Sequence, residues 1–148
     1  MKISEVITKK GSHVVTVESG TTVAEMLRIL DEHGIGALVV SDDGGVTVDG
    51  IASERDVVRA LNREGVEVLH STVRSIMTSE VWTCTSKDEL EALAVSMTEH
   101  RVRHLPVVDD GKLVGVVSIG DVVKHRLDEL EAERNNLFHY VQGDRSMS

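Results

Sequence analysis

The chain repeats one pattern twice, and this repetition limits the folds it can adopt more than any other feature does. Residues 50–58 return as residues 115–123: in both copies a glycine precedes two small or apolar residues, a serine, two variable positions, an aspartate and two valines. Self-similarity of this kind is typical of a duplicated structural unit. We therefore expect two copies of one half, with the repeated polar residues as the first place to look for function.

The similarity between the copies extends in both directions from this segment. Residues 33–40 align with 100–107, residues 14–17 with 81–84, and residues 3–8 with 73–78. The repeat predicts a first copy over residues 1–68, a second copy over residues 69–130, and a C-terminal helix extension and tail over residues 131–148.

Length, charge and cysteine content exclude several classes of protein. With 148 residues the chain is long enough to bury a core. A net charge of −9 argues against nucleic acid as a partner, because that partner needs clustered lysine and arginine. The single cysteine, Cys84, excludes an intrachain disulfide framework and predicts a reducing cytoplasm. No apolar run approaches the roughly twenty residues of a membrane span, and the N-terminus has no signal-peptide core, so we expect no membrane partner.

Hydrophobic periodicity predicts the same order of elements in each copy: strand, helix, strand, strand, helix. The first copy has predicted strands at 14–17, 37–40 and 46–52, a helix from residue 23 with Thr22 and Glu25 as its capping box, and a helix over 53–61. In the second copy the predicted strands are 81–85, 104–108 and 113–117, with helices over 88–100 and from 118 onward. This order indicates a mixed α/β (α+β) fold.

The last predicted helix is much longer than its counterpart in the first copy. Apolar residues continue through Leu127, Leu130, Leu137, Phe138 and Val141 with no proline or glycine before Gly143. One interpretation is a helix that folds back over its own domain, and the other is a surface for a partner. We favour the second and expect a homodimer.

The repeated Ser-x-x-Asp sequence has a structural and a functional interpretation. A serine at the N-cap and an acidic residue three positions later form a capping box. Two details favour ligand binding in addition: capping boxes prefer the longer Glu or Gln, and Gly50 and Gly115 leave room for a close approach. A helix N-terminus attracts anions, and a carboxylate can accept both hydroxyls of a ribose. Together these features indicate a nucleotide site.

Several of these segments carry a family resemblance. The duplicated unit, the Gly-h-x-Ser-x-x-Asp motif in both copies, the sequence RHLPVV at 103–108 and SERDVVRAL at 53–61 resemble a tandem pair of cystathionine-β-synthase (CBS) domains, the Bateman module. The resemblance covers residues 1 to about 130. It implies two copies packed through their sheets with pseudo-two-fold symmetry and two clefts between them. Such clefts bind adenosine-containing ligands (AMP, ADP, ATP, NAD or S-adenosylmethionine) and regulate an effector protein.

The resemblance also implies roles for individual residues. Asp56 and Asp121 would hold ribose hydroxyls, while Ser53 and Ser118 would meet phosphate or the ribose edge. Adenine would lie against Thr16, Val17, Ala37 and Leu38 in one cleft, and against Thr83, Cys84, Leu105 and Pro106 in the other. Positive charge for phosphates would come from Arg55, Arg103 and His104. The copies differ, since Val39 stands where Pro106 does and Gly120 where Arg55 does, so the two clefts are expected to be unequal.

Catalytic and metal chemistry find little support in the sequence. His33, His100 and His104 fall on different predicted elements, and no metal site is expected. No serine, cysteine or lysine has an evident base beside it, so we expect no enzyme and no catalytic cofactor. Two functions remain: a stand-alone sensor of adenosine-containing ligands that signals to an unknown effector, or a ligand-free homodimeric scaffold that acts through its long C-terminal helix.

Overall fold

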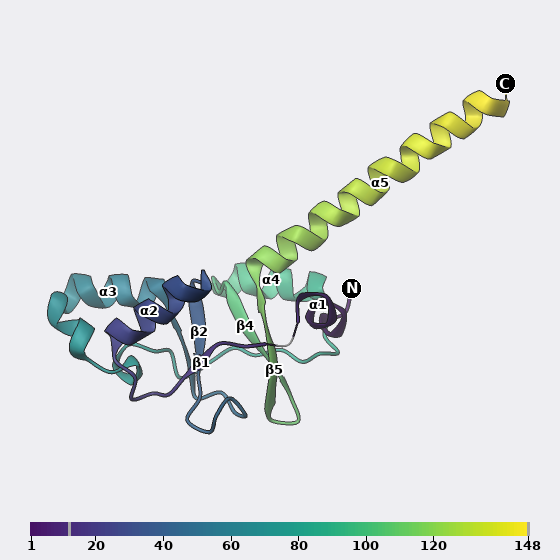
Figure 1. Ribbon diagram of the computed structural model, residues 1–148. Coiled ribbons are helices and arrows are strands. Elements are labelled where there is room, and N and C mark those ends of the chain that lie inside the picture. Colours follow the sequence, from purple (N-terminus) through teal and green to yellow (C-terminus); the bar gives the residue numbers. More distant parts are fainter. Residues whose placement is uncertain (12, 148) are drawn as a thin grey trace.

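Two small sheets form the middle of the molecule, one from each copy of the repeat (Figure 1). The computed structural model describes residues 1–11 and 13–147, with side chains described through residue 142. The first half contains α1 (Ile3–Lys10), β1 (Thr16–Val17), α2 (Val23–His33), β2 (Ala37–Val40), β3 (Gly50–Ser53) and α3 (Glu54–Glu64). Two 3₁₀ turns, η1 (Val66–His70) and η2 (Val73–Ser75), lead to α4 (Leu90–His100), β4 (His104–Asp109), β5 (Lys112–Ser118) and α5 (Ile119–Met147).

The two sheets have related pairings. In the first half β1 is parallel to β2, and β2 is antiparallel to β3. In the second half β4 and β5 are antiparallel, and a single parallel bridge from Cys84 to Val107 takes the place of β1. The predicted strand over 81–85 is therefore wrong, because only Cys84 of that segment pairs. The first predicted strand is shorter than expected and begins at Thr16.

The predicted return strand of the first half also begins later than expected, at Gly50 instead of residue 46. The cause lies in Asp43, whose carboxylate accepts hydrogen bonds from the Val46 and Thr47 N–H groups and from the Thr47 hydroxyl. The Thr47 bonds, with one from Ser41, lower the pKa of Asp43 to about 2. An aspartate that gathers these donors folds its neighbours into a turn and takes them out of the ladder.

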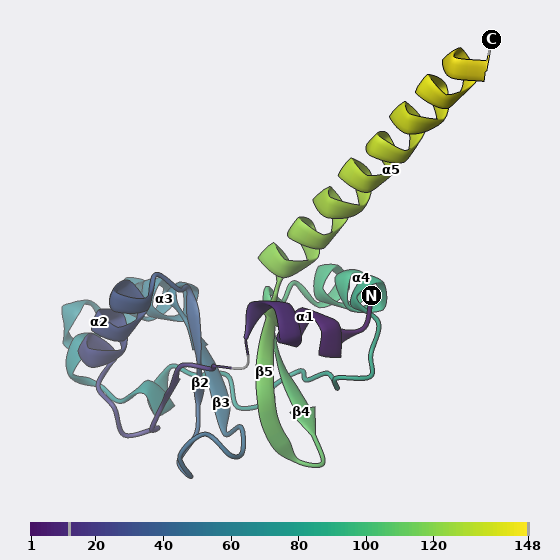
Figure 2. The same ribbon diagram turned by 45° about the vertical axis from the view of Figure 1, so that its right-hand side comes forward.

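The helices lie on the outside of the paired sheets. Figures 1 and 2 both place α2 and α3 beyond the first sheet and α1 and α4 beyond the second, with the strands between them. The hairpin tips also meet, since the Leu113 N–H donates to the Val46 carbonyl across the halves at 2.7 Å. The expected mixed α/β fold of two packed repeats is confirmed.

Each half receives part of its core from the segment that precedes the other half. Ile3 and Val6 of α1 are buried with Leu90, Leu105 and the rest of the second core. Val73, at the position that the repeat aligns with Ile3, is buried in the first core. The two N-terminal segments are thus exchanged between the halves, although one forms a regular helix and the other a 3₁₀ turn.

The exchanged segments explain why the repeated motif begins with glycine. A Cβ on Gly115 would lie 3.1 Å from the Ile7 Cδ1, and one on Gly50 would lie 2.7 Å from the Met77 Sδ and 2.9 Å from the Thr78 carbonyl oxygen. Ile7 and Met77 occupy equivalent positions of the repeat. The close approach that the glycines allow is therefore made by the protein's own chain, which corrects the expectation that a ligand makes it.

The long helix α5 runs away from the rest of the molecule. It contains 29 residues, and both ribbon views show it projecting beyond the helices and sheets (Figures 1 and 2). The interpretation in which this helix folds back over its own domain is therefore wrong. Within the part of the chain that the structure describes, no helix is long and apolar enough to cross a membrane.

Candidate functional site

The two Ser-x-x-Asp turns have nearly the same geometry. In the first, the Asp56 Oδ2 accepts from the Ser53 N–H at 2.8 Å and from its hydroxyl at 3.0 Å, and the Asp56 N–H donates to the Ser53 Oγ at 3.3 Å. The corresponding distances for Ser118 and Asp121 are 2.8, 3.1 and 3.3 Å. Both turns are thus reciprocal capping boxes.

This geometry corrects one argument from the sequence. The shorter aspartate was expected to fall short of the N-cap amide, yet in both copies it reaches the amide at 2.8 Å. The length of the side chain therefore does not favour ligand binding. Every hydrogen bond that the two carboxylates accept ends on Oδ2, so the Oδ1 of Asp56 and that of Asp121 have no hydrogen-bond partner among the described residues.

Lys10 distinguishes the second turn from the first. Its ammonium group donates to the Asp121 Oδ2 at 2.7 Å and to the Val116 carbonyl at 2.9 Å. Burial acts to raise the pKa of Asp121, but the hydrogen bonds from Lys10 and from the Ser118 N–H outweigh it and hold that pKa below its usual value. The repeat aligns Lys10 with Glu80, so the first turn has no equivalent lysine.

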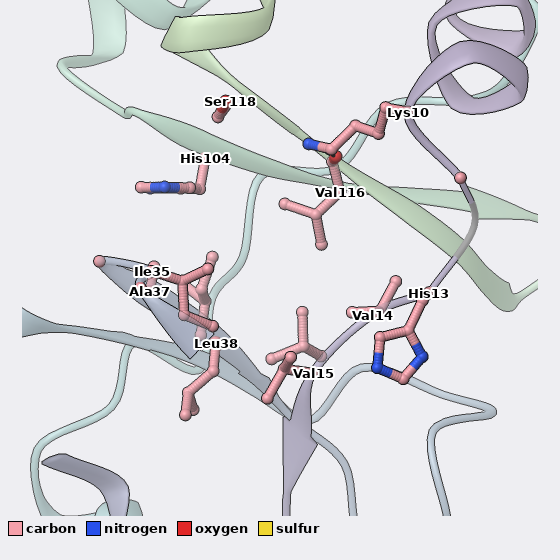
Figure 3. Close-up of a pocket in the computed structure, with 15 residues that line it drawn as sticks. Lys10, His13, Val14, Val15, Ile35, Ala37, Leu38, His104, Val116 and Ser118 are labelled. Carbon is pink, nitrogen blue, oxygen red and sulfur yellow. Dashed lines mark hydrogen bonds between the residues drawn. The ribbon is translucent and has the colours of Figure 1, made fainter. Parts of the chain in front are cut away.

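Beside the second turn a cleft of about 330 Å³ opens between the two halves (Figure 3). The first half contributes the segment after α1 and the start of β2, and the second half contributes β4 and β5. The lining residues are Lys10, Gly11, His13, Val14, Val15, Gly34, Ile35, Gly36, Ala37, Leu38, Val39, Ile51, His104, Val116 and Ser118.

The cleft combines an apolar wall with basic side chains. Figure 3 shows Ile35, Ala37 and Leu38 across from Val116, with Val14 and Val15 beside them. Among the described lining residues, every titratable side chain is basic, namely Lys10, His13 and His104. The apolar wall and these nitrogen donors favour a ligand that carries an apolar ring and hydrogen-bond acceptors.

His104 lies at the boundary of the two halves and is half-buried. Burial is the main cause that lowers its pKa, and the positive charge of Lys10 adds to it, while Asp121 acts in the opposite direction. At neutral pH the imidazole is therefore uncharged and can donate one hydrogen bond and accept another.

The cleft brings together part of the residues that the sequence analysis singled out. Ala37, Leu38, His104 and Ser118 line it, and Asp121 is hydrogen-bonded to Ser118. The others do not line it. Thr16 lies near the loop at Gly45, where an added Cβ would meet its side chain. Four of the residues are buried in the interior, namely Val17, Cys84, Leu105 and Pro106. Ser53 and Asp56 form the other turn, and three are exposed, namely Arg55, Thr83 and Arg103.

The repeat itself contained a signal for some of the missed residues. Ala37 and His104 are equivalent positions, and so are Ile51 and Val116, and all four line the same cleft. Ile51 and Val116 each follow the glycine that opens the repeated motif, so the repeat could have predicted both of them as lining residues. Lys10 and His13 had no such signal, because α1 reaches the cleft only through the exchange of N-terminal segments.

One further group of polar side chains lies outside the cleft. The ligand atoms of Glu91, His125 and Glu129 lie within 4.8 Å of one another, with the His125 Nε2 at 3.1 Å from Glu91 and 3.3 Å from Glu129. No pattern in the sequence predicted this group, whose members come from α4 and α5. Its members are spaced as ion pairs, and the N-terminal amine also bonds to Glu91.

Comparison with known proteins finds related sequences across most of the chain. The CBS domain model matches residues 3–63 and 73–128. A mitochondrial CBS-domain-containing protein of Arabidopsis thaliana is 34% identical over 95% of this chain and 72% of its own. A 17.7 kDa protein of Acidianus ambivalens is 36% identical over 86% of this chain and 74% of its own.

Solved structures of similar proteins agree with the fold. A CBS-domain-containing protein from Agrobacterium tumefaciens is 40% identical, with a TM-score of 0.82 over 85% of this chain and 99% of its own. A CBS domain pair crystallised with 5′-methylthioadenosine and S-adenosyl-L-methionine is 25% identical, with a TM-score of 0.77 over 87% of this chain and 98% of its own.

Proposed function

Because the chain belongs to the CBS-domain family, as a domain pair that covers nearly its whole length, we propose that it senses an adenosine-containing ligand and signals to an effector protein. The ligand class comprises AMP, ADP, ATP, NAD and S-adenosylmethionine. The observation that carries the proposal is the cleft between the halves, which joins an apolar wall to Lys10, His104 and Ser118.

The groups around this cleft suit the three parts of a nucleotide. The apolar side chains offer a slot for the base. Ser118 and the unbonded Oδ1 of Asp121 lie together and can receive the ribose hydroxyls. Lys10 and His104 can donate to phosphate oxygens, and hydrogen bonds to charged groups contribute about 1.5–3 kcal/mol each.

A relative supports the ligand class more than the particular ligand. The domain pair solved with 5′-methylthioadenosine and S-adenosyl-L-methionine shares this fold at 25% identity, and both of its ligands contain adenosine. In this chain the Ser53–Asp56 turn repeats the geometry of the cleft-side turn without its lysine. We assign it to a second, weaker site with less preference for phosphate.

Several properties of the whole protein follow from the same proposal. We expect it to regulate and not to catalyse, because the two CBS domains account for residues 3–63 and 73–128. We expect a homodimer, which the exposed apolar residues of α5 support. A cytoplasmic location stays a prediction; the Arabidopsis thaliana relative is a mitochondrial protein.

The exposed α5 also favours a second candidate function. In that alternative the protein is a ligand-free homodimeric scaffold, and α5 carries its partner surface. The two functions differ in one measurable property, since only the sensor changes stability or shape when a nucleotide is added.

Thermal unfolding with and without each ligand separates the two functions. A ligand present at one hundred times its dissociation constant stabilises the folded protein by about 2.7 kcal/mol per site. We expect Asp121→Ala to remove the stabilisation that arises from the cleft. Asp56→Ala removes the same capping contacts at the other turn and should leave the stabilisation from the cleft in place, with loss only of the smaller contribution of the second site. No shift with any of the five ligands would reject the sensor in favour of the scaffold.

A further inference from the structure

The part of α5 that leaves the module carries a stripe of uncovered apolar side chains. Val123, Leu127, Leu130, Leu137 and Val141 each expose between 44% and 65% of their surface, and both views show this segment projecting away from the rest of the chain (Figures 1 and 2). An isolated amphipathic helix gains little stability in water, because helices in proteins depend on packing of their apolar face.

The spacing of these residues is that of a coiled coil and not of a surface helix. From Val123 to Val141, successive residues of the stripe are separated by four, three, seven and four positions, and these separations fit a seven-residue repeat. In the heptad notation Leu127, Arg134 and Val141 occupy a positions, while Val123, Leu130 and Leu137 occupy d positions. A heptad repeat gives a narrow seam that suits one or more partner helices of the same kind.

We propose that a second copy of this chain covers the seam, so that two α5 helices form a parallel, two-stranded coiled coil over residues 123–141. This inference names the interface of the homodimer in the proposed function, and it does not depend on ligand binding. The match to the CBS domain ends at residue 128, so most of the seam lies beyond the matched domains.

Charges beside the seam are complementary between two identical parallel helices. Arg126 is at a g position, and in a parallel pair it faces the e position five residues on, which is Glu131 of the second copy. Arg134, at the seam, lies next to Glu133 of the second copy. Both pairs occur twice by symmetry. This self-complementarity singles out a second copy among possible partners.

The same charges disfavour the antiparallel arrangement. If Leu127 of one copy packed beside Leu137 of the other, the two Glu131 side chains would face each other across the seam. Like charges at these flanking positions set the orientation of a coiled coil. In the parallel pair Arg134, a polar residue at an a position, faces its own counterpart; this like-charge contact costs stability but fixes the register of the two helices.

Cysteine cross-linking tests both the interface and its direction. In the parallel pair each Leu127 lies beside its own counterpart, so Leu127→Cys should form a disulfide-linked dimer under a mild oxidant. In the antiparallel pair the two substituted positions lie roughly 15 Å apart, given the rise of an α-helix, which is too far for a disulfide. Leu127→Cys mixed with Leu137→Cys would then cross-link instead, and that result would overturn the parallel arrangement.

Two controls are built into the chain. Ala132→Cys places a thiol on the exposed face opposite the seam and should cross-link far less than Leu127→Cys. The native Cys84 is buried, and burial raises the pKa of its thiol to about 12, so the unmodified chain should not cross-link. Equal cross-linking of Ala132→Cys would mean that contact between copies is random.

A second measurement tests the dimer without any cysteine. Sedimentation should give twice the 16.2 kDa chain mass for the unmodified protein and a monomer, or at least tenfold weaker association, for Leu137→Glu, with Ala132→Glu unchanged. A monomeric unmodified protein, or a Leu137→Glu dimer of full strength, would overturn the proposal. Nucleotide binding is measured separately, so failure here leaves the sensor function standing.

Discussion

Lys10 and Asp121 are separated by 111 positions in the chain, yet the Lys10 Nζ lies 2.7 Å from the Asp121 Oδ2. The pair links α1, from the start of the first half, to the first turn of α5, at the end of the second. It also stands beside the cleft, which Lys10 and Ser118 line together.

The first prediction concerns this ion pair. Lys10→Met should lower the free energy of unfolding by about 1 kcal/mol at pH 7, a value reduced for partial exposure to water. Because the pKa of Asp121 lies below its usual value, the stabilisation is present above pH 4 and is lost as the pH falls through the folded pKa. Urea unfolding at pH 7 and pH 3 should therefore show a smaller difference between variant and unmodified protein at pH 3 than at pH 7. Lys9 forms no ion pair among the described residues, so Lys9→Met should leave the free energy of unfolding unchanged at both pH values.

The second prediction concerns the capping boxes. Asp56→Ala should cost about 1 kcal/mol of stability, as the loss of a helix cap does. Asp121→Ala should cost slightly more, because it also removes the ion pair with Lys10, whose side chain is 38% exposed. Chemical unfolding of both variants checks the order, and equal losses would show that Lys10 contributes nothing to folding.

The third prediction compares the two glycines that open the repeated motif. A Cβ on Gly50 would lie 2.7 Å from the Met77 Sδ and 2.9 Å from the Thr78 backbone carbonyl oxygen, whereas one on Gly115 would meet only side-chain atoms of Ile7, at 3.1 Å and beyond. Gly50→Ala should therefore destabilise by about 1–3 kcal/mol, the range for overpacked sites. For Gly115→Ala the expected loss is smaller, at most about 1 kcal/mol. The urea midpoints of the two variants measure these losses. A larger loss for Gly115→Ala than for Gly50→Ala would contradict the packing described here.

The fourth prediction follows from His104. Burial, with the charge of Lys10, lowers its pKa in the folded protein, so the unfolded chain takes up a proton first as the pH falls below about 6.5. Stability should then decrease from that pH until the folded pKa is passed. His104→Gln should flatten this dependence in unfolding measurements between pH 7.5 and pH 5, while the exposed His33→Gln should leave it intact.

The sequence predicted the elements whose pattern is local. Strand β2 and the cores of β4, β5 and the long helix all fall where periodicity placed them. The predicted strand at 81–85 failed because its only pairing, from Cys84 to Val107, depends on a contact with a distant strand. The return strand failed because Asp43 gathers the N–H groups of its neighbours, a competition that hydrophobic alternation does not register.

Some of the residues that line the cleft could be predicted from the sequence, and others could not. Ala37 and His104 were expected at a ligand site through the family resemblance, and both line the cleft. Lys10 was not expected there, since its position depends on how α1 packs against β5. Leu105 and Pro106 were also expected at a ligand site, but both are buried in this structure. They follow His104 in β4 and pack in the interior beside the cleft.

The exchange of N-terminal segments determines when each core can form during synthesis. Ile3 and Val6 leave the ribosome early, but the core they complete also needs Leu105 and Val117, which are made only in the second half of the chain. A nascent chain that stalls between the halves therefore exposes the apolar face of α1 with nothing to cover it. A cut between the halves would leave each core without one of its own segments, so the two halves fold as one unit.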